Sequence, residues 1–239
     1  MWYWIALGLS AFSGGFVQTV TGFGSSILMM CVLPYFMPVL EASALACAIN
    51  VALVVASAVR FRKQLSLKLC LLPGALYLGA YYLTLQFVQQ LKIDAVEIAF
   101  GIFLLLLSLY YLLLAKKASM KDTLTNCFLC AVPSGIMAAV FGIGGPLMAL
   151  LFLARTKDRR TYIGNLHAVF AVSSIMGTVT RFAKGIYTVQ LLPATAVGFA
   201  AVLLGNALGN RVGDRMSPEK LKFWVYLFIG VSGLVTLFT

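Results

Sequence analysis

Polar side chains are scarce in this chain, and those inside apolar stretches are the candidates for chemistry. In chain order they are Gln18, Thr19, Thr21, Ser25 and Ser26, then Asn50, and then Asn165 and His167, the only histidine. Amides, hydroxyls and an imidazole can donate hydrogen bonds to an anion, and polar groups at membrane depth usually face a cavity or the protein interior. No Asp or Glu lies near the centre of an apolar stretch. This absence disfavours a cation site and favours an anionic ligand.

Two glycine clusters add a second kind of hydrogen-bond donor, the backbone N–H group. The clusters are Gly22 with Gly24, and Gly142, Gly144 and Gly145 followed by Pro146. A helix that restarts after such a break presents free N–H groups and the positive end of its dipole, which favour an anion. The alternative is that the glycines only allow helices to pack closely. Their matched placement in two overlong apolar elements favours the broken helix.

Several of these side chains also have a structural interpretation. The side chains of Gln18, Thr19 and Thr21 could bond to their own helix backbone. His167 could bridge two helices as a neutral ring instead of binding an oxyanion or carrying a proton. We interpret Arg181 and Lys184 as side chains that extend to lipid headgroups rather than as an anion site. The basic loop 155–160 is interpreted as a determinant of topology.

The composition identifies the setting of these residues. The chain has 239 residues, is 62% hydrophobic and only 10% charged, and has a mean hydropathy of +0.97. A soluble domain carries about 25% charged residues, so we predict an all-α integral membrane protein with the lipid bilayer as its main partner. The net charge of +11 comes from short basic loops, which indicates cytoplasmic loops and not nucleic-acid binding. No metal site, other cofactor or nucleotide-binding loop is predicted.

Eight apolar elements are predicted between the polar breaks. They cover 2–33, 39–59, 69–89, 95–114, 123–154, 162–180, 187–210 and 223–238. Six have the length of one membrane helix, about 20 residues. The first and fifth are too long for one span and contain internal glycines, which include Gly14, Gly15 and Gly135 besides the two clusters. We therefore expect both to be broken or re-entrant.

The two overlong elements repeat each other at an offset of 120 residues. The matches are Gly15 with Gly135, Val20 with Val140, Gly22 with Gly142, Gly24 with Gly144, and Leu72-Pro73 with Leu192-Pro193. The constant spacing predicts an N-terminal repeat, 1–118, and a C-terminal repeat, 119–239.

The distribution of basic residues predicts how the two repeats are oriented. If both long elements return to the side on which they began, one face collects 15 basic residues and the other 3. Single crossings throughout would divide them equally. The positive-inside rule favours the first arrangement, in which the halves have inverted topology and both termini lie outside. Trp2, Tyr3 and Trp4 would then anchor the chain at the outer interface.

The glycine motifs resemble those of a known family. They are Gly14-Gly15-Phe16 through Gly22-Phe23-Gly24-Ser25, Ser134-Gly135 through Gly142-Ile143-Gly144-Gly145-Pro146, and Gly205-Asn206-Ala207-Leu208-Gly209 followed by Arg211. The pattern is similar to that of the sulfite exporter TauE/SafE family, in the toluene sulfonate uptake permease group, over essentially the whole chain. Ser25, Ser26 and Pro146 depart from the commonest motif. The resemblance implies a multi-pass transporter, generally an exporter, of sulfite or organosulfonates.

The sequence thus predicts a secondary transporter of the cell (inner) membrane that exports a small anion by alternating access. The expected ligand site combines the polar side chains and glycine clusters named above, and proton coupling through His167 is one option. The alternative is a non-transporting scaffold or assembly protein. An intramembrane enzyme would need catalytic residues that the sequence does not offer. The coupling ion, the exact anion and the oligomeric state stay open.

Overall fold

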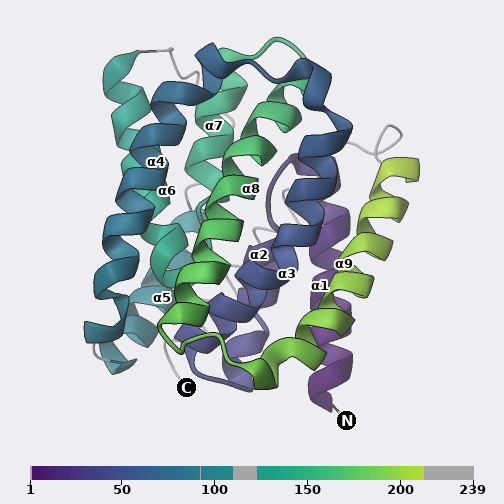
Figure 1. Ribbon diagram of the computed structural model, residues 1–239, viewed down its shortest axis with the longest axis vertical. Helices are drawn as coiled ribbons and strands as arrows, with labels where there is room; N and C mark the ends of the chain where they lie inside the picture. The colour runs from purple at the N-terminus through teal and green to yellow at the C-terminus, as the bar shows by residue number, and fades with distance from the viewer. Residues whose placement is uncertain (1, 92, 110–122, 213–239) are drawn as a thin grey trace.

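The protein is described by a computed structural model that covers residues 2–91, 93–109 and 123–212. This part of the chain is helical and contains no strand (Figure 1). Its α-helices are α1 (Trp2–Thr21), α2 (Ser25–Met30), α3 (Val39–Arg60), α4 (Leu67–Phe87), α5 (Ile93–Leu109), α6 (Leu124–Phe141), α7 (Gly145–Arg155), α8 (Arg159–Ala183) and α9 (Leu192–Val212). The prediction of an all-α protein is confirmed.

Within the described residues, five helical segments are long and apolar enough to cross a membrane. They are Val39–Arg60, Leu67–Gln90, Leu124–Phe141, Arg159–Ala183 and Val189–Arg211. Two shorter apolar segments, Ser25–Tyr35 and Gly145–Arg155, follow the breaks. The chain is therefore a multi-pass membrane protein. The predicted eighth element, 223–238, and the basic loop 116–122 lie outside the described residues.

The structure breaks the first and fifth predicted elements at their glycine clusters. Three residues separate the end of α1 at Thr21 from the start of α2 at Ser25, and three separate the end of α6 at Phe141 from the start of α7 at Gly145. Gly22, Gly24 and Gly142 have φ angles of 91°, 119° and 71°. Residues other than glycine rarely adopt these backbone conformations, so glycine permits both turns.

The remaining glycines of the long elements allow close packing instead. Gly14, Gly15 and Gly135 lie inside α1 and α6, which corrects their assignment to the breaks. A Cβ atom on Gly15 would collide with the backbone oxygen of Val202 in α9, and one on Gly135 would meet backbone atoms of α4. Such close approach of backbones is a common way to pack helices in membranes.

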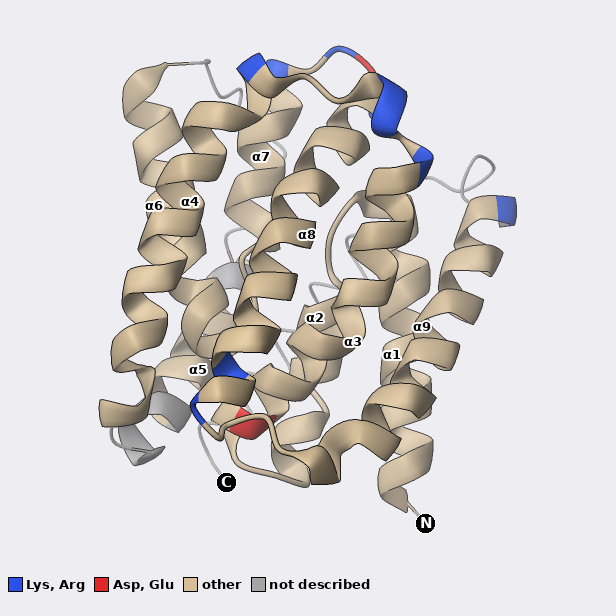
Figure 2. Cartoon of the chain, in the orientation of Figure 1, with Lys and Arg blue, Asp and Glu red and all other residues tan. Residues whose placement is uncertain are grey.

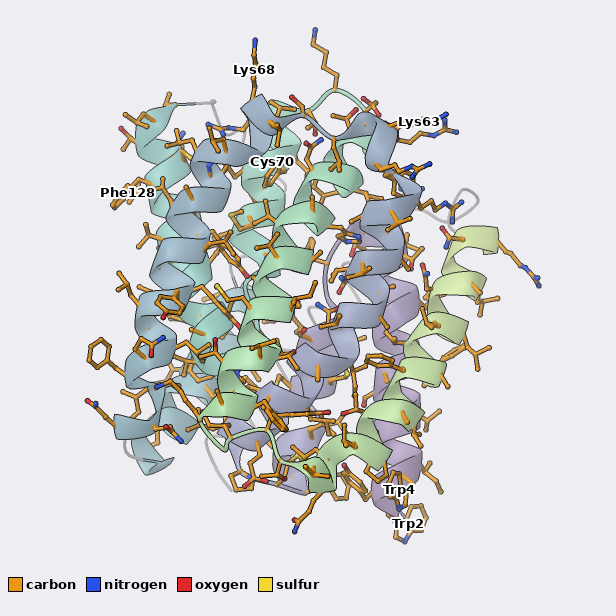
Figure 3. The ribbon with its side chains drawn as sticks, in the orientation of Figure 1. Trp2, Trp4, Lys63, Lys68, Cys70 and Phe128 are labelled. Atoms are coloured by element: carbon orange, nitrogen blue, oxygen red, sulfur yellow. The ribbon has the colours of Figure 1, made fainter. Side chains whose placement is uncertain are left out.

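Charge is distributed unevenly along the bundle. Figure 2 shows the Lys and Arg positions, coloured blue on the ribbon, gathered mainly at the upper end, where Figure 3 labels Lys63 and Lys68. Trp2 and Trp4 lie at the lower end, beside the N-terminus (Figure 3). This is the arrangement expected from the positive-inside rule. That the upper end faces the cytoplasm, and that two inverted repeats make up the fold, stay predictions.

Candidate functional site

A cavity of about 40 Å³ lies where the two helix breaks meet. The turn between α1 and α2 contributes Gly24, and the turn between α6 and α7 contributes Gly144. The turns also contact each other, because a Cβ atom on Gly145 would lie only 2.7 Å from the Cβ atom of Phe23. The two broken elements therefore face each other. We call this space the central cavity.

About half of the predicted ligand residues line the central cavity. They are Gln18, Gly24, Ser26, Asn50, Gly142, Gly144 and Gly145. Its wall also holds residues that the sequence did not single out, among them Tyr77 and Tyr81 of α4 and Ser173 and Ser174 of α8. The two tyrosines are four residues apart on one helix face, a spacing that could have indicated a shared surface.

Gln18 forms the link between α1 and α2. Its Oε1 accepts a hydrogen bond of 3.0 Å from the backbone N–H of Ser25, the first residue of α2. Three buried side-chain atoms near this link have no partner in the described part of the chain: Gln18 Nε2, Asn50 Oδ1 and Ser25 Oγ. Gln18 and Asn50 line the central cavity, whereas Ser25 does not. An unpaired buried polar atom costs about 1–3 kcal/mol, so the two amide atoms are candidates to bond a polar ligand or water in the cavity.

Thr19 and Thr21 bond to the backbone of their own helix, as the structural interpretation predicts, and Thr19 also bonds to α9. Thr19 Oγ1 lies 2.7 Å from the carbonyl oxygen of Gly15 and 2.7 Å from Asn206 Oδ1. Thr21 Oγ1 lies 3.0 Å from the carbonyl oxygen of Val17 and 2.6 Å from that of Phe23, so it also bonds within the turn. Neither lines the central cavity.

α8 closes the end of α1 with three side chains. Arg159 Nη2 donates to the carbonyl of Thr19 at 2.8 Å, and Tyr162 Oη donates to that of Thr21 at 3.0 Å. His167 Nε2 donates to the carbonyl of Gly22 at 2.8 Å. The last carbonyls of a helix lack intrahelical donors, and α8 supplies them. His167 is fully buried, and its Nδ1 has no protein partner.

The same helix closes the end of α6 through Arg181. Its Nη2 donates to the carbonyls of Ala139 at 2.7 Å and Ala138 at 3.3 Å, and its Nη1 donates to Tyr81 Oη at 2.7 Å. Arg181 is only 1% exposed. The expectation that it extends to lipid headgroups is wrong, because the partly negative end of α6 binds the guanidinium inside the protein.

Arg181 has no acidic partner in the described ranges. All its partners there are the two carbonyls and the Tyr81 hydroxyl. Because Tyr81 Oη accepts from the guanidinium, its own proton is directed to Cys47 Sγ, 3.9 Å away, whose S–H donates to the carbonyl of Ser174. Sulfur is a weak acceptor, and Tyr81 lines the central cavity, so the oxygen of an anion there would be a stronger acceptor for the same O–H group. The arrangement places a buried positive charge one hydrogen bond from the cavity.

Asn165, by contrast, is a structural residue. Its Oδ1 accepts from Ser66 N at 2.8 Å, and its Nδ2 donates to the carbonyls of Gln64 at 3.0 Å and Thr161 at 2.7 Å. The side chain thereby joins α8 to the turn before α4. Its amide donors and its acceptor are all used, and the side chain lines neither the central cavity nor a second cavity at the charged upper end.

A second cavity, of about 120 Å³, opens at the charged upper end. Its polar and charged lining consists of Thr19, Ser57, Arg60, Arg159, Arg160, His167, Asn206 and Asn210. We call it the vestibule. Two arginines of the loop 155–160 thus line a cavity, a role that their interpretation as topology determinants did not include. The end of α1 lies between the vestibule and the central cavity, since Gln18 lines one and Thr19 the other.

Comparisons with known proteins agree with this architecture. The model of the sulfite exporter TauE/SafE family matches residues 7–236. A probable membrane transporter protein from Methanocaldococcus jannaschii is 26% identical over 148 residues, which is 58% of this chain and 55% of that protein. The chain thus covers little more than half the length of this relative. No solved structure matches this chain. Because the family match extends over nearly the whole chain, the protein belongs to the sulfite exporter TauE/SafE family.

Proposed function

We propose that this protein is a secondary transporter that exports a small oxyanion, sulfite or a small organosulfonate, across the cell (inner) membrane. The observation that carries the proposal is the central cavity at the meeting point of two helix breaks, with unpartnered buried polar atoms in its wall. Membership of the family and the name of the archaeal relative support transport. The cavity is the proposed binding site.

The charge around the cavity favours an anion. Arg181 is buried without a carboxylate in the described part of the chain, and the Tyr81 hydroxyl that it contacts donates only to the weak acceptor Cys47 Sγ. Among the described residues, none that lines the cavity is acidic. A negative guest would therefore gain from the nearby positive charge, which is weakly screened in a buried site. The same positive charge would make the binding of a cation unfavourable.

Hydrogen-bond donors would hold the anion in place. Gln18 Nε2 is the unpartnered side-chain donor in the cavity wall near the first break, and the Tyr81 hydroxyl is the donor from α4. The volume of about 40 Å³ has room for only a few water molecules. That scale suits a small ion with several oxygen atoms and excludes large organic anions from the observed state.

Alternating access would move the two breaks in turn. α8 binds the end of α1 near the vestibule through His167 and binds the end of α6 through Arg181. Release towards the upper end would require the first set of bonds to open, and release towards the lower end the second. The proposed inverted repeats, 1–118 and 119–239, would give both steps the same construction.

The decisive test is anion flux in proteoliposomes with a paired substitution. Tyr81→Phe removes the hydroxyl that faces the cavity, and Tyr82→Phe removes a hydroxyl from a side chain that is 48% exposed on the same helix. We expect sulfite flux in the wild type to exceed sulfate, taurine and acetate flux. Tyr81→Phe should raise the half-saturating sulfite concentration about tenfold, the effect of one lost charge-assisted hydrogen bond, while Tyr82→Phe should leave it unchanged.

Three results would contradict the proposal. Folded wild-type protein that moves none of these anions would favour a non-transporting scaffold. Equal effects of Tyr81→Phe and Tyr82→Phe would remove the central cavity from the mechanism. Flux of a cation in place of the anions would show that the charge argument is wrong.

A further inference from the structure

The vestibule has the features of a binding site in its own right. Arg60 comes from the end of α3, while Arg159 and Arg160 come from the first turn of α8. Hydroxyl and amide side chains, such as Ser57 and Asn210, complete the polar wall. None of the described residues that line it is acidic. Its volume of about 120 Å³ is three times that of the central cavity.

Two of the three arginines are available to a ligand. Arg60 makes no ion pair in the described ranges and lies over the ring of Phe61, with 5.5 Å between Cζ and the ring centroid. Arg160 likewise has no ion pair there and is exposed. The nearby carboxylate of Asp158 accepts a 2.9 Å hydrogen bond from Thr161 N instead. The positive end of the α8 dipole adds to the field of the arginines.

A buried group without a partner lines the floor of the vestibule. His167 is fully buried and lines this cavity, and its Nδ1 has no hydrogen-bond partner. The other ring nitrogen, Nε2, must carry a proton because it donates to the carbonyl of Gly22. In the neutral ring Nδ1 is therefore an acceptor, suited to the O–H group of a protonated oxyanion.

The geometry points to a second oxyanion site in the vestibule, for a singly protonated oxyanion such as hydrogensulfite. Arg60 and Arg160 would bind its charged oxygens, and His167 Nδ1 would accept a hydrogen bond from its O–H group. This inference rests on the proposed function for the identity of the anion. The vestibule would collect the anion at the charged end of the bundle before α1 moves. The end of α1, held by Arg159 and His167, would separate this site from the central cavity.

The test compares two double substitutions that remove the same charge. Arg60→Gln with Arg160→Gln neutralises two arginines that line the vestibule, whereas Arg62→Gln with Lys63→Gln neutralises two exposed residues of the adjacent turn that do not line it. Equilibrium binding of radiolabelled sulfite is measured on detergent-purified protein without anionic lipid. Sulfite flux is then measured in membrane vesicles of both orientations.

We expect the wild type to bind two sulfite ions and the vestibule variant one, with the control variant unchanged. Flux from the charged end should need about tenfold more sulfite for half-saturation in the vestibule variant, since two nearby charges contribute on that scale. Flux from the opposite end should keep its half-saturation. Tyr81→Phe should weaken the other binding site and leave the vestibule site intact.

The outcomes separate this inference from the proposed function. A single bound sulfite in the wild type, or equal effects of the two double substitutions, would overturn the vestibule site even if transport is observed. Two bound ions without any flux would support the vestibule site and contradict the transporter. Binding that appears only when anionic lipid is absent and is abolished by adding it would assign the vestibule to lipid headgroups and overturn the inference.

Discussion

Replacement of Arg181 tests the link between the fold and anion binding most directly. Arg181→Gln removes the guanidinium that joins α8 to α4 and α6, and the shorter amide cannot reach all three acceptors. Ala138 O keeps a 3.0 Å hydrogen bond from Gly142 N. The substitution therefore leaves Ala139 O without this donor and removes the hydrogen bond to Tyr81. At about 1–3 kcal/mol for an unpaired buried acceptor and 1.5–3 for a charged hydrogen bond, we expect the free energy of unfolding to fall by about 2.5–6 kcal/mol.

The same substitution should also weaken anion binding. The charge lies one hydrogen bond from the cavity, through Tyr81 Oη at 2.7 Å. We expect the half-saturating sulfite concentration to rise at least tenfold, equivalent to about 1.4 kcal/mol. The assays are the apparent Tm of the detergent-purified protein and sulfite flux in proteoliposomes, each compared with the wild type.

Arg181→Lys separates the charge of this residue from its shape. Lysine keeps the positive charge but lacks the planar fork that serves Tyr81 and Ala139 together. We expect it to recover a large part of the sulfite affinity and little of the stability. The reasoning is refuted if Arg181→Gln has wild-type affinity, or if lysine restores the Tm and not the affinity.

Two further substitutions test the contact between the two breaks, at Gly145, and the start of α8, at Asp158. Gly145→Ala should reduce sulfite flux more than tenfold, because its Cβ atom would lie 2.7 Å from that of Phe23, whereas Gly79→Ala, with no atom within 4 Å, should leave flux unchanged. Hydrogen bonds from Thr161 lower the pKa of Asp158, so this carboxylate stabilises the fold fully above its unfolded-state pKa and loses the effect as pH falls through the folded value. Thermal unfolding of Asp158→Asn should therefore show a deficit at neutral pH that disappears in acid.

Much of the fold could be predicted from the sequence because its signals are local. The composition and the lengths of the apolar runs identify the membrane helices. Gly22, Gly24 and Gly142 mark the turns because their φ angles suit glycine alone. Gly15 and Gly135 could not be distinguished from them, since their neighbours in α9 and α4 are distant in the sequence.

The same limit applies to the site. Gln18 and Asn50 could be predicted to line a cavity because amides in apolar helices need partners. The position of Arg181 could not, since its partners Tyr81 and Ala139 lie about 100 and 42 residues away. A basic residue near a helix end looks alike in sequence whether it extends to lipid or turns inward to another helix end.

α8 connects the separate parts of this architecture. It binds the end of α1 through His167 and, 14 residues later, the end of α6 through Arg181, so one helix holds both breaks. A rigid displacement of α8 along its axis would disturb both sets of bonds at once, whereas a tilt would open one and preserve the other. The proposed alternating access would require that the two routes never open together, so a tilt of α8, with the closed break as pivot, is the motion that the proposal predicts.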